Sequence, residues 1–217
     1  MRMSRKDDNE MKLFSIFKIY RYPAYIKMLW YRYWLPYKIS RKGIRLQGRV
    51  YFLGWPIINL APDSTIEIDT DSNLCSLSQY TALGVSHPVI IRTLRAGALV
   101  KIGKGVRMSG TTICATKRIV IGNNVCIGAN VTIVDTDFHS LDPNIRKSPM
   151  DAKEASVSAV EIEEDVFIGA GCFILKGVRI GRGSIVGAGS VVTKSCPAFS
   201  VIAGNPAVPI NSVYHQP

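Results

Sequence analysis

The fold of this chain is decided by residues 162–192, which read IEEDVFIGAGCFILKGVRIGRGSIVGAGSVV. An aliphatic side chain returns at every sixth position of this stretch: Ile162, Ile168, Ile174, Ile180, Val186 and Val192. A period of six matches neither an amphipathic helix, which repeats about every 3.6 residues, nor a single strand, which repeats about every 2. Hexapeptide periodicity is typical of a parallel β-helix, whose short strands stack on those of the preceding coil. We therefore predict an all-β fold in which the aliphatic residues fill a narrow core.

The repeat extends towards the N-terminus and is interrupted once. The same spacing of six is found at Val100 and Val106, and again at Ile121, Ile127 and Ile133. It disappears between residues 134 and 161, a stretch rich in Asp, Ser, Pro and Lys. An irregular segment of this length inside a compact domain is usually functional. We predict a β-helix domain over residues 48–210, with a loop inserted at about 138–161 and a tail over 211–217.

Almost all of the net charge lies in the first 50 residues. The whole chain is +11, and residues 1–50 hold 13 Lys/Arg against 3 Asp/Glu, which gives +10. Tyr, Trp and Phe are interleaved with these cations over residues 11–40. One interpretation of the segment 1–47 is a helical lid on the first coil. The other is peripheral membrane contact through residues 11–45, with aromatic rings at headgroup level and cations on anionic lipid. Base stacking is the weaker alternative, so we expect no nucleic-acid partner.

The cysteines and histidines favour a cytoplasmic protein without a metal. The five cysteines form no CxxC pair and are odd in number, which favours reduced, buried thiols. No stretch approaches the ~20 apolar residues needed to span a bilayer. The three histidines, His87, His139 and His215, lack the spacing of a ligand set, and catalytic zinc usually needs three protein ligands.

His139 ends the sequence Asp135-Thr136-Asp137-Phe138-His139, where the repeat gives way to the loop. In an extended segment, residues 135, 137 and 139 would share one face. An imidazole next to carboxylates is the arrangement of a general base, because one nitrogen accepts a proton while the other donates to a carboxylate. The alternative is a surface turn with a solvated histidine and two capping aspartates. The residues alone leave both interpretations open; in the catalytic one, Asp137 or Asp135 orients His139.

Four motifs carry a resemblance to a known family: residues 121–125 (IGNNV), 135–139 (DTDFH), 186–194 (VGAGSVVTK) and 203–207 (AGNPA). The chain resembles the hexapeptide-repeat, or left-handed β-helix, acyltransferases, which include galactoside, maltose and serine O-acetyltransferases. The resemblance covers residues 96–207 and is greatest for the branch that acetylates sugars of polysaccharides. It implies a left-handed coil, a homotrimer around a threefold axis, and acetyl-CoA in the groove between neighbouring prisms.

The resemblance also implies roles for individual residues, first of all that His139 is the catalytic base. Four positions correspond to the lining of the CoA groove: Ala170, Ala188, Thr193 and Lys194. For the two alanines, simple coil packing is an equally good explanation. Arg146 corresponds to a substrate-binding position, with a solvated loop charge as its alternative. His87 lies outside these motifs; it is a candidate for the acceptor pocket, although a structural loop histidine is the simpler interpretation.

The expected activity is O-acetyl transfer from acetyl-CoA, as co-substrate, to a sugar hydroxyl of a cell-surface or exported polysaccharide, without an acyl-enzyme. One departure concerns residues 208–211, which are uncharged where relatives often carry basic residues that meet the CoA phosphates. Two alternatives remain. One is an acetyltransferase for an amino acid or antibiotic, and the other is a catalytically silent trimeric scaffold that docks on a membrane.

Overall fold

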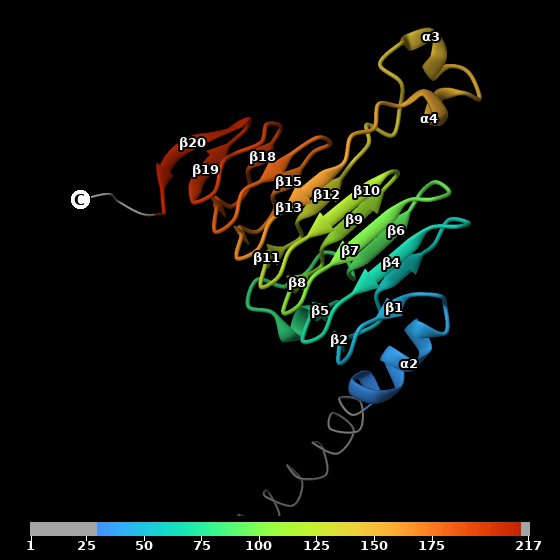
Figure 1. Cartoon of the computed structure of the whole chain (residues 1–217), viewed down its shortest axis with the longest axis vertical. Helices are drawn as coiled ribbons and strands as arrows, with labels where there is room; N and C mark the ends of the chain where they lie inside the picture. The colour runs from blue at the N-terminus through green and yellow to red at the C-terminus, as the bar shows by residue number, and fades with distance from the viewer. Residues whose placement is uncertain (1–29, 214–217) are drawn as a thin grey trace, which may run out of the picture.

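The computed structural model describes residues 30–213, which form a parallel β-helix with three sheets as the faces of a prism (Figure 1). Sheet A contains β1 (Arg45–Leu46), β4 (Thr65–Ile68), β7 (Leu99–Ile102), β10 (Arg118–Ile121), β13 (Val160–Ile162) and β16 (Arg179–Ile180). Sheet B contains β2 (Tyr51–Leu53), β5 (Asn73–Cys75), β8 (Arg107–Ser109), β11 (Cys126–Ala129), β14 (Phe167–Ile168), β17 (Ile185–Val186), β19 (Ser200–Gly204) and β20 (Ala207–Ser212). Sheet C contains β3 (Ile57–Asn59), β6 (Ile90–Thr93), β9 (Thr112–Ala115), β12 (Thr132–Val134), β15 (Phe173–Ile174) and β18 (Val191–Val192).

The core consists of the aliphatic side chains that the hexapeptide repeat directs inward. All six aliphatic residues of the opening stretch are fully buried, from Ile162 to Val192. Neighbouring strands pair in parallel register, as Ile168 of β14 does with Val186 of β17. Burying each such side chain contributes roughly 1.5–3 kcal/mol. The predicted all-β coil is therefore confirmed.

Small residues at the corners let successive coils approach closely. A Cβ added to Gly169 would lie 2.5 Å from the backbone nitrogen of Ala188, one coil further on. This distance is shorter than any real Cβ contact, so only glycine fits the corner between sheets B and C at this level. Glycine at position 169 is therefore required by close backbone approach.

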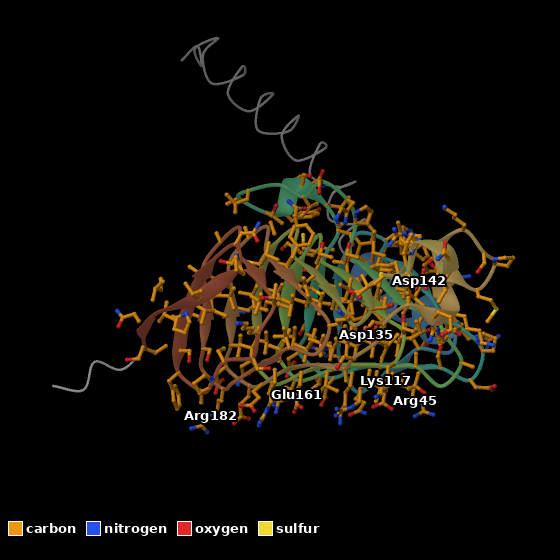
Figure 2. The ribbon with its side chains drawn as sticks, turned by 90° about the horizontal axis from the view of Figure 1, so that it is seen from above. Arg45, Lys117, Asp135, Asp142, Glu161 and Arg182 are labelled. Atoms are coloured by element: carbon orange, nitrogen blue, oxygen red, sulfur yellow. The ribbon has the colours of Figure 1, made fainter. Side chains whose placement is uncertain are left out.

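The outer faces of the sheets differ in charge. Paired positions along sheet A read Arg45, Glu67, Lys101, Val120, Glu161 and Arg179. Figure 2 shows Arg45, Lys117, Glu161 and Arg182 along one side of the prism. Paired positions along sheet C read Ile57, Ile90, Thr112, Thr132, Phe173 and Val191, none of which is charged. A second outward row of sheet C contains one charged side chain, the exposed Arg92 of β6. Sheet A is thus the more highly charged of these two faces.

Two insertions leave the coil. Residues 76–89, with the 3₁₀ turn η2 (Ser78–Tyr80), lie between β5 and β6. Residues 135–159 lie between β12 and β13, contain α3 (Pro143–Arg146) and α4 (Asp151–Glu154), and project away from the prism (Figure 1). We call this second insertion the excursion. It starts and ends slightly earlier than the loop expected at about 138–161, and it contains two single-turn helices that the aperiodic sequence did not indicate.

Each end of the coil is covered by a different element. At the N-terminal end lie the π-helical turn η1 (Trp30–Trp34) and the helix α2 (Leu35–Ser40), which buries Leu35 and Ile39. At the other end β20 pairs with β19 in antiparallel fashion. The expectations for residues 11–29, and His215, lie outside the described part of the chain. Within residues 30–213, no helix is long and apolar enough to cross a membrane.

Candidate active site

His139 lies at the root of the excursion, five residues after β12 ends. The two ends of the excursion run side by side, because Ser158 N donates to Asp135 O (2.9 Å) and Asp137 N donates to Ser156 O (3.1 Å). Phe138 has a positive φ of 64°. This conformation is strained for a bulky residue, and strain of this kind is concentrated at functional sites. The strained turn at Phe138 therefore lies directly before His139.

His139 forms a close pair with Asp151. Its Nδ1 lies 2.5 Å from Oδ2 of Asp151, whose Oδ1 accepts a hydrogen bond from Ser140 N (2.7 Å). The hydrogen bond from His139, followed by that from Ser140, holds the pKa of the Asp151 carboxyl below its ordinary value. An ionised carboxylate only accepts hydrogen bonds, so Nδ1 must donate. Nε2 of the neutral imidazole is then a proton acceptor, on a side chain that is 68% exposed.

Asp151, rather than Asp135 or Asp137, is the carboxylate that contacts His139. The side chain of Asp137 instead pairs with Nζ of Lys176 (3.0 Å). The expected alternation of residues 135, 137 and 139 on one face is wrong, because β12 ends at Val134 and the chain turns at Phe138. Asp151 is 12 residues from His139 in an aperiodic segment, so spacing carried no signal for it.

Asp135 supports the coil below the site. It is completely buried, and its carboxylate accepts hydrogen bonds from the backbone N–H groups of Thr116 (2.6 Å), Lys117 (2.7 Å) and Arg118 (2.8 Å). These groups form the corner between β9 and β10, one coil earlier. Figure 2 shows Asp135 within the body of the prism and Asp142 in the excursion. The structure thus gives Asp135 a structural contact.

Arg146 holds the excursion in shape. Its Nη1 donates to the carbonyl oxygens of Ser140 (3.0 Å) and Leu141 (3.2 Å). The two residues directly after His139 are thereby held by the last residue of α3. The expectation that Arg146 binds substrate stays a prediction, and the contacts seen are internal.

Arg95 connects the excursion to the coil. It lies between β6 and β7, and its Nη2 donates to the carbonyl oxygens of Ala152 and Lys153, the latter at 2.9 Å. Both acceptors belong to α4, which begins with Asp151. Arg95 therefore fixes the helix that carries the partner of His139. Arg95 could not be predicted from the sequence, because the contact joins residues 57 and 58 positions apart.

The four residues expected to line a CoA groove lie at two corners of the prism. Ala170 and Ala188 stack at the corner between sheets B and C, where Gly189 N donates to Ala170 O (2.8 Å). Thr193 and Lys194 follow β18, at the exposed corner between sheets C and A. Lys176, the partner of Asp137 near His139, follows β15 at this same corner. Within one chain, the width of sheet C separates the two pairs.

His87 belongs to the first insertion and is held by its own loop. Its Nδ1 lies 2.8 Å from Pro88 O, and the neighbouring Ser86 N donates to Oδ1 of Asn130 (2.9 Å). Asn130 follows β11 at the corner between sheets B and C. His87 is therefore on the side of Ala170 and Ala188, and the structure does not bring it to His139.

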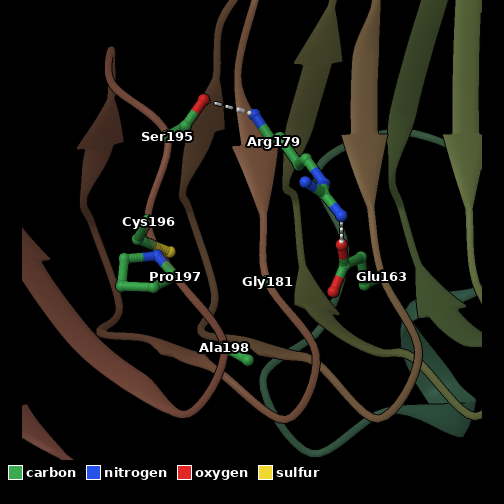
Figure 3. Close-up of a pocket in the computed structure, with 7 residues that line it drawn as sticks. All are labelled: Glu163, Arg179, Gly181, Ser195, Cys196, Pro197 and Ala198. Carbon is green, nitrogen blue, oxygen red and sulfur yellow. Dashed lines mark hydrogen bonds and ion pairs between the residues drawn. The ribbon is translucent and has the colours of Figure 1, made fainter.

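The pocket drawn in Figure 3, with a volume of about 350 Å³, lies elsewhere, on the outside of sheet A and its corner with sheet B. An ion pair between Arg179 and Glu163 crosses it, and Arg179 N donates to Oγ of Ser195 (2.9 Å). None of the predicted site residues lines it.

All five cysteines are unpaired and four are buried. Burial raises the pKa of Cys114 and Cys172. No three His, Cys, Asp or Glu side chains between residues 30 and 213 are grouped to hold a metal ion.

The fold and the His139–Asp151 pair together define a class of protein. It is a parallel β-helix with an imidazole–carboxylate pair at the point where a loop leaves the coil. Residues 159–194, which span β13–β18, match the family described as bacterial transferase hexapeptide (six repeats). The galactoside O-acetyltransferase of Lactococcus lactis is 41% identical over 113 residues, 52% of each chain. The 2,3,4,5-tetrahydropyridine-2,6-dicarboxylate N-acetyltransferase of Staphylococcus aureus is 52% identical over 52 residues, 24% of this chain and 22% of that one. The chain spans at most about half the length of these relatives.

Two solved structures share the fold. A galactoside acetyltransferase in complex with coenzyme A superposes with a TM-score of 0.51 and 22% identity, covering 87% of this chain and 78% of that one. A mutant of AntD, an N-acyltransferase from Bacillus cereus in complex with dTDP-4-amino-4,6-dideoxyglucose and coenzyme A, gives 0.55 and 16%, covering 83% and 90%. Their coil is the left-handed parallel β-helix. The predicted resemblance to the hexapeptide-repeat acetyltransferases is confirmed.

Proposed function

We propose that this protein is an acetyl-CoA-dependent O-acetyltransferase that acts on a sugar hydroxyl of a cell-surface or exported polysaccharide. The observation that carries the proposal is the His139–Asp151 pair, in which the contact of Nδ1 with an ionised carboxylate leaves Nε2 to accept a proton. The names of the Lactococcus relative and of the solved galactoside enzyme support acetyl-CoA and a sugar as the two substrates. Because acetyl-CoA is a cytoplasmic metabolite, the proposed reaction takes place in the cytoplasm.

The proposed mechanism is direct transfer. Nε2 of His139 removes the proton from the sugar hydroxyl as its oxygen attacks the thioester carbonyl of acetyl-CoA. The tetrahedral intermediate collapses, the carbon–sulfur bond breaks, and the imidazolium returns its proton to the departing CoA thiolate. Asp151 stabilises the imidazolium that forms in between, and Arg95 and Arg146 keep the pair in place. Base catalysis of this kind contributes typically about 10²–10⁴-fold.

We propose that the CoA site is completed between copies of the chain in a homotrimer. Sheet C supports this proposal because its strands carry a single charged side chain, Arg92, and expose Phe173, which is 46% accessible. If three sheet C faces surround a threefold axis, the C–A corner of one prism lies next to the B–C corner of its neighbour. His139, Thr193 and Lys194 of one copy would then face Ala170 and Ala188 of the next. Lys194 supplies a cation for a CoA phosphate.

The test is release of CoA thiol from acetyl-CoA against a panel of mono- and disaccharides, measured in parallel for the unchanged chain and His139→Ala. Sugar-dependent release that the substitution abolishes is the expected result. Amino sugars belong in the panel, because the Staphylococcus relative is named as an N-acetyltransferase. Release with amines alone would replace the O-acetyl proposal with N-acetyl transfer.

A second measurement separates an enzyme with an untested acceptor from a silent scaffold. An enzyme binds CoA, which raises its melting temperature even when no acceptor in the panel reacts. A chain that neither releases thiol nor gains thermal stability from CoA contradicts the proposed function.

A further inference from the structure

An aromatic and basic surface at the N-terminal end of the prism is not used by the proposed reaction. We call it the aromatic cap, and it comprises Trp30, Trp34, Tyr37, Lys38, Arg41, Lys42 and Trp55. Its three tryptophan rings form one cluster. The ring centroids of Trp30 and Trp34 are 4.4 Å apart, and those of Trp55 lie 5.6 Å and 6.4 Å from them. These are all the tryptophans of the chain.

Most of the aromatic cap lies on the outer side of η1 and helix α2, and α2 packs firmly on the first coil. Helix α2 buries Leu35 and Ile39 against the first coil. Trp34 and Trp55 nevertheless remain 40% and 43% exposed, and Tyr37 is exposed beside them. Contiguous exposed aromatic surface on a well-packed element marks an interaction site. Tryptophan in particular is enriched where one part of the ring is in an apolar medium and the other part is in water.

The sequence around the tryptophans of the cap is rich in basic residues and contains no acidic residue. Residues 30–50 contain six Lys/Arg and no Asp or Glu. Nζ of Lys38 lies 4.5 Å from the centroid of the Trp34 ring, one helical turn before it in sequence. Arg45 pairs with Glu67, but no carboxylate in the described ranges lies within ion-pair distance of Lys38, Arg41 or Lys42. All three side chains are exposed: Lys38 lies against an exposed indole, and Arg41 and Lys42 directly follow α2.

We propose that the aromatic cap docks on the surface of a membrane that contains anionic lipid. The indole rings would lie at headgroup level, and Lys38, Arg41 and Lys42 would face lipid phosphates. Tryptophan together with Lys or Arg is the side-chain combination that binds such an interface. The 29 residues before Trp30 add seven Lys/Arg against three acids, so the chain that continues from the cap has the same sign of charge. The proposal is independent of acetyl transfer, and either can fail alone.

The position of the tryptophans makes the test direct. The full chain is mixed with phosphatidylcholine vesicles that either contain or lack phosphatidylglycerol, and its tryptophan emission is recorded. Because every tryptophan lies in the aromatic cap, docking shifts the emission to shorter wavelength, and brominated phosphatidylcholine in the vesicles quenches it. We expect both effects with phosphatidylglycerol and much weaker effects without it. Sedimentation with vesicles that leaves the emission unchanged would show that another surface binds, and would overturn the proposal.

Two variants test the two kinds of contact. Each cation near an anionic membrane strengthens binding about 5-fold. Replacing Lys38, Arg41 and Lys42 together by Gln is therefore expected to weaken vesicle binding on the order of 100-fold. Trp34→Gln keeps Trp30 and Trp55 as reporters and is expected to weaken the binding that persists at high salt. Both variants leave Leu35 and Ile39 unchanged, and circular dichroism checks that they fold.

The matched control removes the same number of exposed cations from sheet A and its corners. Lys101, Lys104 and Lys117 are replaced by Gln, and this variant is expected to bind vesicles almost as well as the unchanged chain. If the control weakens binding as much as the variant of the aromatic cap, the attraction is only that of net charge. In that case the cap is not the docking surface.

Discussion

A single carboxylate, Asp151, decides which nitrogen of His139 can accept a proton. His139 itself was predictable, because the repeat breaks close to it and the DTDFH motif resembles that of a known family. Asp151 was not predictable, because the folding of the excursion, rather than a strand period, brings it to the imidazole. The two aspartates of the DTDFH motif, Asp137 and Asp135, contact Lys176 and the preceding coil instead.

We predict that Asp151→Asn lowers kcat, though less than His139→Ala, which is expected to lower it about 10²–10⁴-fold. An amide at this position can donate to Nδ1 and so favour the tautomer whose Nε2 is protonated. Asp142→Asn is the matched control, since Asp142 caps α3 through Asn144 N (2.8 Å) and does not contact His139. Steady-state kinetics of the three variants measures the difference. Equal losses in Asp142→Asn and Asp151→Asn would contradict the assigned role of Asp151.

A second prediction concerns the titration of Asp151. Its pKa is below the ordinary 3.8, chiefly because His139 hydrogen-bonds to it. A carboxyl with a lowered folded pKa stabilises the fold above its ordinary value, and this contribution is lost as the pH falls through the lowered value. The Asp151 carboxyl should thus be ionised, and able to accept the hydrogen bond from His139, above about pH 4. Carboxyl ¹³C NMR should show a midpoint below 3.8 that rises in His139→Ala. An unchanged midpoint in the variant would argue against the contact in solution.

At the scale of elements, the coil follows from the repeat and the excursion does not. Each strand is specified locally, because its inward aliphatic residue and corner glycine recur in the sequence. The excursion is specified by long-range contacts to backbone atoms, from Arg95 to α4 and from Asp135 to the corner before β10. Such contacts leave no periodic trace. Only the cap of α3, with Asp142 before Pro143, is a local signal that sequence inspection could have used.

Arg95→Ala is expected to loosen the excursion while the coil stays folded. The carbonyl oxygens of Ala152 and Lys153 lose their donor, so α4 and Asp151 become more mobile. Hydrogen exchange of residues 140–154 should accelerate, and kcat should fall with little change in the KM for acetyl-CoA. Arg95→Lys, which can reach one of the two carbonyls, should restore part of the activity. Arg182→Ala, at the corner between sheets A and B, is the control and should leave exchange in this segment unchanged.

Asp135→Asn is expected to destabilise the coil itself. An amide presents an N–H group where the carboxylate accepts from backbone N–H groups, and each unsatisfied buried group costs about 1–3 kcal/mol. We expect the free energy of unfolding in urea to fall by about 3 kcal/mol. Asp165→Asn makes the same chemical change at an exposed corner and should alter stability by less than about 0.5 kcal/mol. If both variants unfold at the same urea concentration, the buried carboxylate is not important for stability.

At the scale of the whole molecule, the three faces of the prism differ enough to suggest its assembly. Sheet A carries side chains of both charges along its length, whereas the strands of sheet C carry one charged side chain, Arg92. This contrast could not be predicted from the sequence. The outward residues of neighbouring strands can be aligned with one another only once the register between coils is known. The homotrimer and the boundary at residue 47 remain predictions.

Phe173→Glu is expected to prevent trimer formation. It would place three carboxylates near the proposed threefold axis, where like charges without partners are costly to bury. Light scattering after size exclusion should show a trimer for the unchanged chain and a monomer for the variant. Phe167→Glu makes the same change on sheet B, at a side chain of similar exposure, and should remain trimeric. A monomeric unchanged chain would contradict this assembly.

The covers at the two ends of the coil have a consequence for solubility. A stack of parallel strands has edge strands at both ends. The unpaired backbone groups of each edge strand are a template to which another chain could add strands. Here η1 and α2 lie over the first coil, and β20 runs against the direction of β19 and so ends the parallel order of sheet B. The edge strands β1 and β18 have only two residues each. The prism therefore resists end-to-end polymerisation into fibres. Loss of β20 would expose β19 as an edge strand to which a strand of another chain could add.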